Sequence, residues 1–256
     1  MSVNDAIRHA LTEIEATHDV RVLYAAESGS RAWGFASPDS DYDVRFIYVH
    51  RLEWYLRVGE ARDVIEAMLP GDLDLSGWEV RKALGLFKRT NLALNEWLDS
   101  PIVYVEHGDF ARRMRALIAP GFRTPAGHNH YLSLAKRKFE ETLASDPVRL
   151  KDVFYALRAL LACRWIRQTA SQPPTEFRKL VDADGVTQTE RRMIAELMAA
   201  KARANEGERS ALAPAVRAWL ERELDLAKTA TDGLRSSDTL QTSVLDELLR
   251  ATVLGQ

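Results

Sequence analysis

Four residues near the N-terminus have the types and spacing of a phosphate-handling site. Gly29 and Ser30 follow one apolar segment, and Asp41 and Asp43 lead into a second one at residues 44–49. Because residues two apart in a strand point to the same face, the two carboxylates should project together, about 7 Å apart along the backbone. Paired carboxylates suit a divalent cation such as Mg²⁺ or Mn²⁺. Glycine lets a phosphate approach the backbone N–H groups and Ser30 adds a hydroxyl donor, so the stretch predicts nucleotide chemistry.

A third acidic group is expected from a later strand, because two-metal phosphoryl transfer needs more than two carboxylates. Asp72 and Asp74 share one face of the strand-like run at residues 72–75, which follows a Pro-Gly turn. Asp74 is favoured, since leucines flank it on both sides. Asp72 adjoins the turn and is the alternative.

Each of these pieces alone is also typical of an ordinary solvated turn. Their combination is rarer, and with it the chain resembles the DNA polymerase β-like nucleotidyltransferase superfamily, whose signature is Gly-Ser followed by Asp-x-Asp. The string ESGSRAWGF…SDYDVRFIY is similar to one branch, the predicted nucleotidyltransferases associated with RNA-repair operons (RlaP-like). The similarity continues through LSGWEVRKAL, NEWLDSPIVY, FYALRALLACRWI and PPTEF, and so covers most of residues 20–205. It implies that Asp41, Asp43 and Asp74 are the catalytic metal ligands.

The fold class that we expect is α+β, in two domains. Strand-like runs alternate with helical segments up to about residue 120, and residues 119–130 are rich in Gly and Pro, which marks a boundary. The chain beyond them has helical periodicity throughout. We therefore predict a small mixed-sheet catalytic domain over 1–120 and an all-helical domain over 121–256, which the resemblance implies covers the nucleotide.

The predicted helix at residues 148–168 carries further candidates for nucleotide binding. Lys151, Tyr155 and Arg158 fall on one stripe, opposite an apolar stripe of the same helix. Cationic side chains on such a stripe suit phosphate oxygens, and the tyrosine ring suits a base. The alternative is a solvated outer face that binds nothing.

Composition sets the remaining limits. The chain has 256 residues, of which 46% are hydrophobic and 28% charged, as in globular proteins, and its net charge is −2. So small a charge gives no global attraction to nucleic acid, and RNA would need a local patch such as 112–115 or 136–138. A single cysteine excludes an intrachain disulfide, and without a signal-peptide pattern or a membrane-length apolar segment we expect a cytoplasmic protein with no membrane partner.

The expected reaction is transfer of a nucleotidyl group from a nucleoside triphosphate to a hydroxyl acceptor, with release of pyrophosphate. The resemblance favours RNA as the acceptor, and a small molecule or a protein is the alternative. A different class also stays open, a non-catalytic interaction protein such as the nucleotidyltransferase-fold partners of some toxin–antitoxin pairs. Which nucleotide is used and whether the protein oligomerises do not follow from the sequence.

Overall fold

The structure is a computed structural model that describes residues 2–143, 146–203, 205, 207–230, 234 and 240–255. It forms two compact units. The first comprises 1–32, 41–121 and 238–256, and the second comprises 33–40 and 122–237. The chain therefore passes between the units four times. This division differs from the predicted one, because 33–40 belongs with the helices and the C-terminal segment belongs with the sheet.

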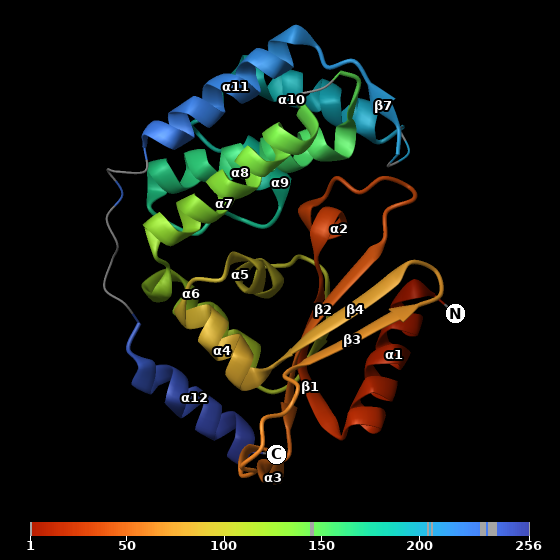
Figure 1. Ribbon diagram of the computed structural model, residues 1–256, viewed down its shortest axis with the longest axis vertical. Helices are drawn as coiled ribbons and strands as arrows, with labels where there is room; N and C mark the ends of the chain where they lie inside the picture. Colours follow the sequence, from red (N-terminus) through yellow and green to blue (C-terminus); the bar gives the residue numbers. More distant parts are fainter. Residues whose placement is uncertain are drawn as a thin grey trace. The chain divides into compact units, whose positions relative to one another are not determined.

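The first unit is built on a five-stranded mixed sheet (Figure 1). Its strands are β1 (Val20–Glu27), β2 (Tyr42–His50), β3 (Val64–Leu69), β4 (Leu73–Glu79) and β5 (Val103–Glu106). Their order across the sheet is β3-β4-β2-β1-β5. Only β2 and β4 among these neighbours run parallel, and the other pairs are antiparallel. The predicted α+β class with a mixed sheet is confirmed.

Helices cover both faces of this sheet, as Figure 1 shows with α1 on one side of the strands and α4 and α12 on the other. On the first face, α1 (Val3–His18) packs Ile7 and Leu11 against Val44 and Phe46 of β2. On the second face, Ile47 and Val49 of β2 face a different set of helices. These are α4 (Val80–Lys88), α5 (Leu92–Leu98), α6 (Phe110–Gly121) and α12 (Thr242–Leu254). The alternation along β2 is that of a strand buried on both sides.

The C-terminal helix α12 belongs to the core of the first unit. Leu245, Leu248 and Val253 are each less than a tenth exposed and lie in the same apolar cluster as α4 and α6. This burial is the physical reason why the C-terminal segment is not part of the helical unit. Two short helices, α2 (Gly29–Trp33) and α3 (Leu52–Tyr55), complete the elements between strands.

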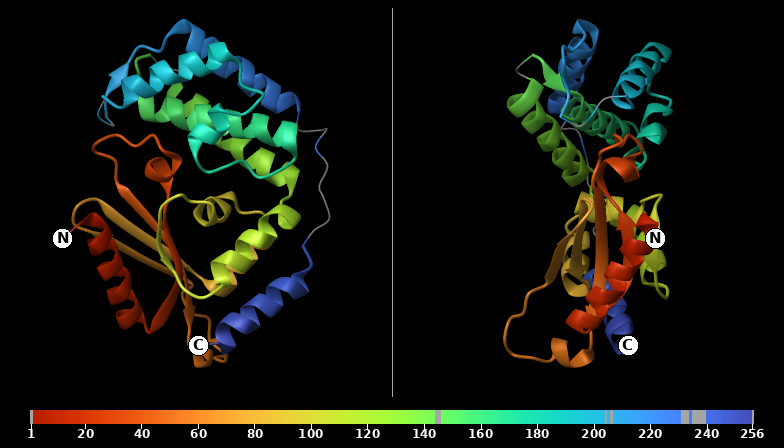
Figure 2. Two further views of the ribbon diagram at one scale, coloured as in Figure 1. Left: turned by 180° about the vertical axis from the view of Figure 1, so that it is seen from behind. Right: turned by 90° about the vertical axis from the view of Figure 1, so that its right-hand side faces the viewer.

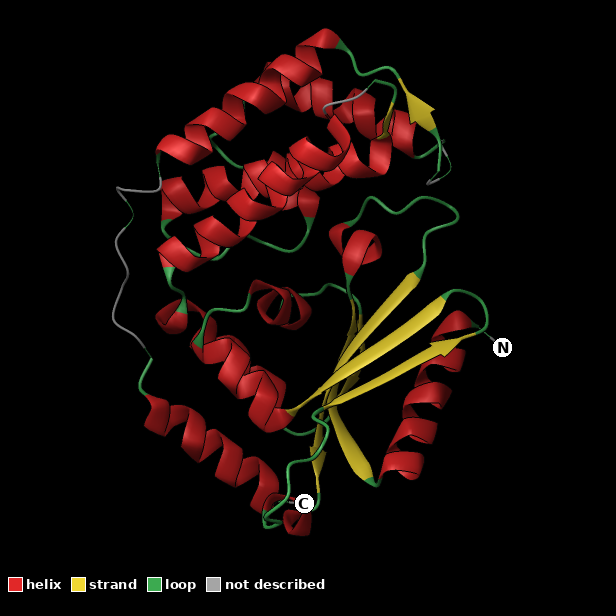
Figure 3. Cartoon of the chain, viewed as in Figure 1, coloured by secondary structure: helices red, strands yellow, loops and turns green. Residues whose placement is uncertain are grey.

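The described part of the second unit is helical, apart from one short strand pair. Its elements are α7 (Thr124–Lys138), the π-helix η1 (Phe139–Leu143), β6 (Val148–Arg149), α8 (Leu150–Thr169), α9 (Phe177–Val181), α10 (Gln188–Lys201), β7 (Arg209–Ser210) and α11 (Pro214–Thr229). Figure 3 separates these helices from the strands of the sheet by colour. The predicted Gly- and Pro-rich linker is largely helical instead, since Pro125 occupies the first turn of α7, where proline is tolerated.

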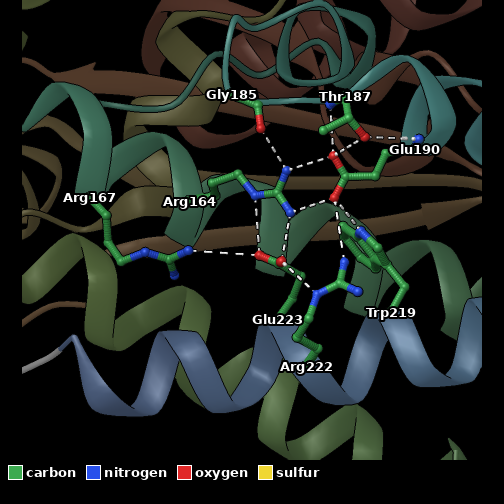
Figure 4. A network of polar contacts seen from close by, with 8 residues as sticks. All are labelled: Arg164, Arg167, Gly185, Thr187, Glu190, Trp219, Arg222 and Glu223. Atoms are coloured by element: carbon green, nitrogen blue, oxygen red, sulfur yellow. Dashed lines mark hydrogen bonds and ion pairs between the residues drawn. The ribbon is translucent and has the colours of Figure 1, made fainter.

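A buried network of charges holds three helices of the second unit together (Figure 4). Arg164 of α8 donates to Glu190 of α10, with Nη2 2.8 Å from Oε1, and to Glu223 of α11, with Nε 3.1 Å from Oε2. Trp219 Nε1 donates to the same Glu190 oxygen at 2.6 Å. Burial alone would raise the pKa of Glu190, but the donors Arg164, Trp219 and Thr187 outweigh it and lower that pKa to about 2.

None of the described helices combines the length and the apolar character that crossing a bilayer requires.

Candidate active site

Two of the predicted carboxylates lie side by side on neighbouring strands. Asp43 is the second residue of β2 and Asp74 the second of β4, and the parallel register of these strands places them directly opposite each other. Both alternate with core residues of the α1 face, so both point to the opposite face of the sheet. Parallel pairing therefore brings together two acids that are 31 positions apart in the sequence.

Arg45 joins these two carboxylates. Its Nη2 lies 2.9 Å from Asp43 Oδ1 and 2.7 Å from Asp74 Oδ2. Its Nη1 donates to the main-chain oxygens of Val44 and Asp74, both at 3.2 Å. The side chains of Asp43 and Asp74 are about one-third exposed, at 32% and 33%, and that of Arg45 is 18% exposed. One guanidinium thus neutralises part of the charge of an accessible carboxylate pair.

Gly29 lies against the Asp43 carboxylate. Its φ of +62° is in the left-handed region, and a methyl group at this position would collide with Asp43 Oδ2. The preceding N–H, of Ser28, donates to the Asp43 carbonyl at 2.8 Å. Ser30 follows within α2 and is buried. The glycine is therefore required here by both backbone conformation and space.

Asp41 lies one residue before β2 and is exposed. Its main-chain oxygen accepts a hydrogen bond from Arg31 Nε at 3.0 Å, and the Arg31 guanidinium lies 3.8 Å from the centre of the Tyr42 ring. Among the described residues, no group of three or more His, Cys, Asp or Glu side chains is arranged to hold a metal. The structure thus brings Asp43 and Asp74 together. Asp41 lies two residues before Asp43 and outside β2, so the predicted pairing of Asp41 and Asp43 on one strand face is not seen.

The two candidates for the third acid differ in their surroundings. Asp72 is exposed, has a φ of +56° in the turn between β3 and β4, and offers its main-chain oxygen to the Tyr42 N–H at 2.9 Å. Asp74 shares Arg45 with Asp43. The geometry favours Asp74.

Glu27 is a buried acid of this site that the sequence reading missed. It ends β1, its Oε1 accepts the Asp43 N–H at 2.8 Å, and its Oε2 accepts the hydroxyl proton of Tyr104. Burial raises the pKa of the Glu27 carboxyl. An acidic residue directly after the apolar run at residues 22–26 is the signal that could have identified it.

The donor set suits a hard divalent cation. Asp43 and Asp74 already bind one cationic group jointly, through carboxylate oxygens that are about one-third exposed. Oxygen ligands of this type are those that Mg²⁺ and Mn²⁺ prefer. The carboxylates of Asp43 and Asp74 therefore fit such a metal.

The family described as the RNA repair pathway DNA polymerase beta family matches residues 3–251. This chain belongs to that family. The resemblance inferred from the motif is thereby confirmed, and the protein is nucleotidyltransferase-like, of the DNA polymerase β type.

Two further comparisons accompany the family match. The chain is 41% identical over 244 residues to the uncharacterized protein YcgL of Bacillus subtilis (strain 168), covering 95% of this chain and 94% of that protein. It is also similar to the crystal structure of a nucleotidyltransferase-like protein from Exiguobacterium sibiricum 255-15, at 11% identity and a TM-score of 0.33, over 100% of this chain and 81% of that one.

The residues predicted on the helical unit of this family member lie in two environments. Lys151 and Tyr155 of α8 are partly exposed, and the Tyr155 ring meets Trp33 edge-on at 4.9 Å between centroids. Arg158 is only 1% exposed. Its guanidinium lies 4.4 Å from the centre of the Trp33 ring and donates to the Thr175 carbonyl at 3.3 Å. The expectation that Arg158 is presented on an accessible stripe is wrong, because α8 is buried on nearly all sides.

Segment 33–40 explains this burial. It connects the Gly-Ser half of the motif to the Asp-x-Asp half, yet it packs within the helical unit. Phe35 lies 5.1 Å from Phe154 and 5.3 Å from Phe177 between ring centroids. Lys201 Nζ, on a residue that is 3% exposed, donates to Ser37 Oγ at 2.8 Å. Lys201, which had no assigned role from the sequence, therefore helps to hold the segment between the two halves of the motif.

Proposed function

We propose that this protein is a metal-dependent nucleotidyltransferase that moves a nucleotidyl group from a nucleoside triphosphate to a hydroxyl acceptor and releases pyrophosphate. The observation that carries the proposal is the pair of carboxylates of Asp43 and Asp74, held side by side next to the Gly29 turn. Membership of a polymerase β-type family supports the reaction class. The family description, which names an RNA repair pathway, supports an RNA hydroxyl as the acceptor.

The proposed reaction forms one bond and breaks another at the α-phosphorus. The acceptor oxygen bonds to it, the bond to the pyrophosphate oxygen breaks, and the acceptor gives up its proton. Asp74 is placed by this proposal beside the acceptor hydroxyl, where its carboxylate takes that proton. Asp41, Asp43 and Asp74 would hold a Mg²⁺ or Mn²⁺ ion, which would supply neutralising charge for the triphosphate oxygens.

The remaining residues bind and orient the nucleotide in this proposal. Gly29 and Ser30 contact the terminal phosphates through backbone N–H groups and the Ser30 hydroxyl. Lys151 and Tyr155 of α8 remain predicted ligands of the phosphates and the base. Arg158 has a different role, since its contact with Trp33 places it in the packing of segment 33–40.

One incubation tests the proposal. Purified protein is mixed with each of the four ribonucleoside triphosphates, labelled at the α-phosphate, together with Mg²⁺ and total RNA. Label in RNA, lost in the Asp43→Asn variant and in chelator, is the expected result. Label on a small molecule or on the protein would change the acceptor class, while no transfer to any acceptor with any of the four would favour a non-catalytic interaction protein.

A further inference from the structure

We propose that Arg45 is a built-in counter-cation that competes with the divalent metal for Asp43 and Asp74. The inference rests on the proposed function, because it concerns the same carboxylates. In this proposal the metal binds Asp43 and Asp74 only when Arg45 has moved away from them. Arg45 moves away most readily when a bound triphosphate forms hydrogen bonds with its guanidinium.

The two terminal nitrogens of Arg45 have different partners: Nη1 contacts the main chain and Nη2 contacts the two carboxylates. Nη1 donates to two main-chain oxygens, those of Val44 and Asp74, each at 3.2 Å. These bonds orient the planar guanidinium, so that Nη2 reaches Asp43 Oδ1 at 2.9 Å and Asp74 Oδ2 at 2.7 Å. Both acids therefore share one nitrogen, on a side chain that is 18% exposed.

Charge makes this arrangement competitive with a metal. One guanidinium leaves the two carboxylates with a net charge of about −1, which lowers their mutual repulsion. A divalent ion at Asp43 Oδ1 and Asp74 Oδ2 would lie within contact distance of the guanidinium, and repulsion between the two cations opposes their binding together at these oxygens. Metal binding therefore requires that the ion pairs of Arg45 Nη2 with Asp43 and Asp74 be broken.

A triphosphate offers Arg45 a replacement partner. Guanidinium groups form forked, charge-assisted hydrogen bonds with phosphate as well as with carboxylate. When the nucleotide accepts Arg45, the cost of displacing it falls, and metal and nucleotide bind cooperatively. By linkage, the factor by which the nucleotide raises metal affinity equals the factor by which the metal raises nucleotide affinity.

Direct Mn²⁺ binding to nucleotide-free protein is the test, measured by the electron paramagnetic resonance signal of free Mn²⁺ or by calorimetry. Arg45→Met keeps a side chain of similar length without charge, and it should bind Mn²⁺ roughly tenfold or more tightly than the wild type. Arg51→Met is the matched control, since it removes an arginine from the same unit whose ion pair with Asp19 is exposed and away from the site. That control should leave Mn²⁺ affinity unchanged, and Asp43→Asn should lower it.

A second measurement tests the coupling. A non-hydrolysable triphosphate should raise Mn²⁺ affinity by a larger factor in the wild type than in Arg45→Met, because only the wild type has Arg45 to relocate. Should Arg45→Met fail to fold, Arg45→Gln takes its place, with circular dichroism as the check.

The outcomes separate this inference from the proposed function. If the wild type binds Mn²⁺ through Asp43 but loss of Arg45 leaves that affinity equal or weaker, the counter-cation role is overturned and the nucleotidyltransferase proposal stands. If neither the wild type nor Arg45→Met binds Mn²⁺ more tightly than Asp43→Asn does, with or without nucleotide, the metal site is absent and both fail.

Discussion

At the scale of single residues, Asp74 and Asp72 provide a matched pair of acids. Asp74 shares Arg45 with Asp43, whereas Asp72 lies in an exposed turn two residues earlier. Asp74→Asn should lower turnover by several orders of magnitude, because it removes an interaction made in the transition state. Asp72→Asn should cost less than about tenfold. Single-turnover transfer rates check the ranking, and the reverse order would move the third ligand to Asp72.

A second glycine, Gly34, allows the effect of the contact between Gly29 and Asp43 to be distinguished from the effect of backbone strain. Gly29→Ala places a methyl group in the left-handed region and against Asp43, while Gly34, with a φ of +85°, has nothing within 4 Å of an added methyl. Gly34→Ala should cost about 1–2 kcal/mol of stability from strain alone. Gly29→Ala should cost more and should also abolish transfer.

Denaturant unfolding and the transfer assay, run together on both glycine variants, provide the comparison. If the two variants lose equal stability and both retain activity, the contact between Gly29 and Asp43 is not required for transfer.

Strand periodicity predicted that Asp41 and Asp43 share a face, as do Asp72 and Asp74. The structure places Asp41 before β2 and Asp72 in the turn before β4, so neither pair lies within one strand. Asp43 and Asp74 come together instead because β2 and β4 pair in parallel, and their role as ligands stays a prediction.

Arg45 was not predicted, since its partner Asp74 is 29 positions away and depends on β2 pairing with β4 in parallel. Glu27 was missed for a similar reason, because its bond to Tyr104 joins two strands across the sheet.

At the scale of elements, α8 shows where periodicity misleads. A stripe of Lys151, Tyr155 and Arg158 opposite an apolar stripe predicts an accessible face. The structure buries Arg158 instead, because Trp33 arrives from a segment 125 positions earlier and covers it. No local pattern contains that information.

Lys151 remains the cation of that stripe with a predicted role at phosphate. Lys151→Ala should weaken triphosphate binding roughly ten- to a hundredfold, since a charge-assisted hydrogen bond contributes about 1.5–3 kcal/mol. Nucleoside binding should change little. Titration with triphosphate, monophosphate and nucleoside separates these effects, and unchanged triphosphate affinity would place Lys151 on plain surface.

The charge network of α8, α10 and α11 gives a prediction in pH. Since hydrogen bonds lower the pKa of Glu190 to about 2 in the folded state, its ionised form stabilises the fold above its ordinary pKa of 4.5. That contribution is lost as the pH falls from about 4.5 to about 2. Glu190→Gln should therefore lower the unfolding free energy by about 3–5 kcal/mol at neutral pH, as when a buried pair loses one partner.

The difference between wild type and Glu190→Gln should shrink as the pH falls through that window. Denaturant unfolding at a series of pH values measures it, with Glu196→Gln, an exposed position of the same helix, as the control. A difference that does not vary with pH would mean that folding does not shift the pKa of Glu190.

At the scale of the whole molecule, the first unit is completed by α12, which lies more than a hundred residues beyond the end of α6. Figure 2, left, shows α12 from behind, beside the yellow-green helix α6, and α12 shares one apolar cluster with α4 and α6. Leu248 is 1% exposed in the shared core, and Leu254 of the same helix is 67% exposed. The helix contributes to stability through one face.

Leu248→Ala should lower the unfolding free energy by about 2–5 kcal/mol, because it leaves a cavity under the helix. Leu254→Ala should change it by less than about 0.5 kcal/mol. Chemical unfolding followed by tryptophan fluorescence makes the comparison, since Trp97 belongs to the same cluster as Leu248. Equal effects would mean that α12 is not docked as described.

The position of α12 in the chain also sets an order of events during synthesis. A ribosome makes all five strands and both carboxylates first, then residues 122–237 of the helical unit, and only afterwards helix α12, which packs on the second face of the sheet. Until residues 245–253 have left the exit tunnel, the apolar surface they cover stays open to chaperones and to other nascent chains. The carboxylates lie within the first third of the chain, but the apolar core beneath their sheet is complete only after α12 has been synthesised.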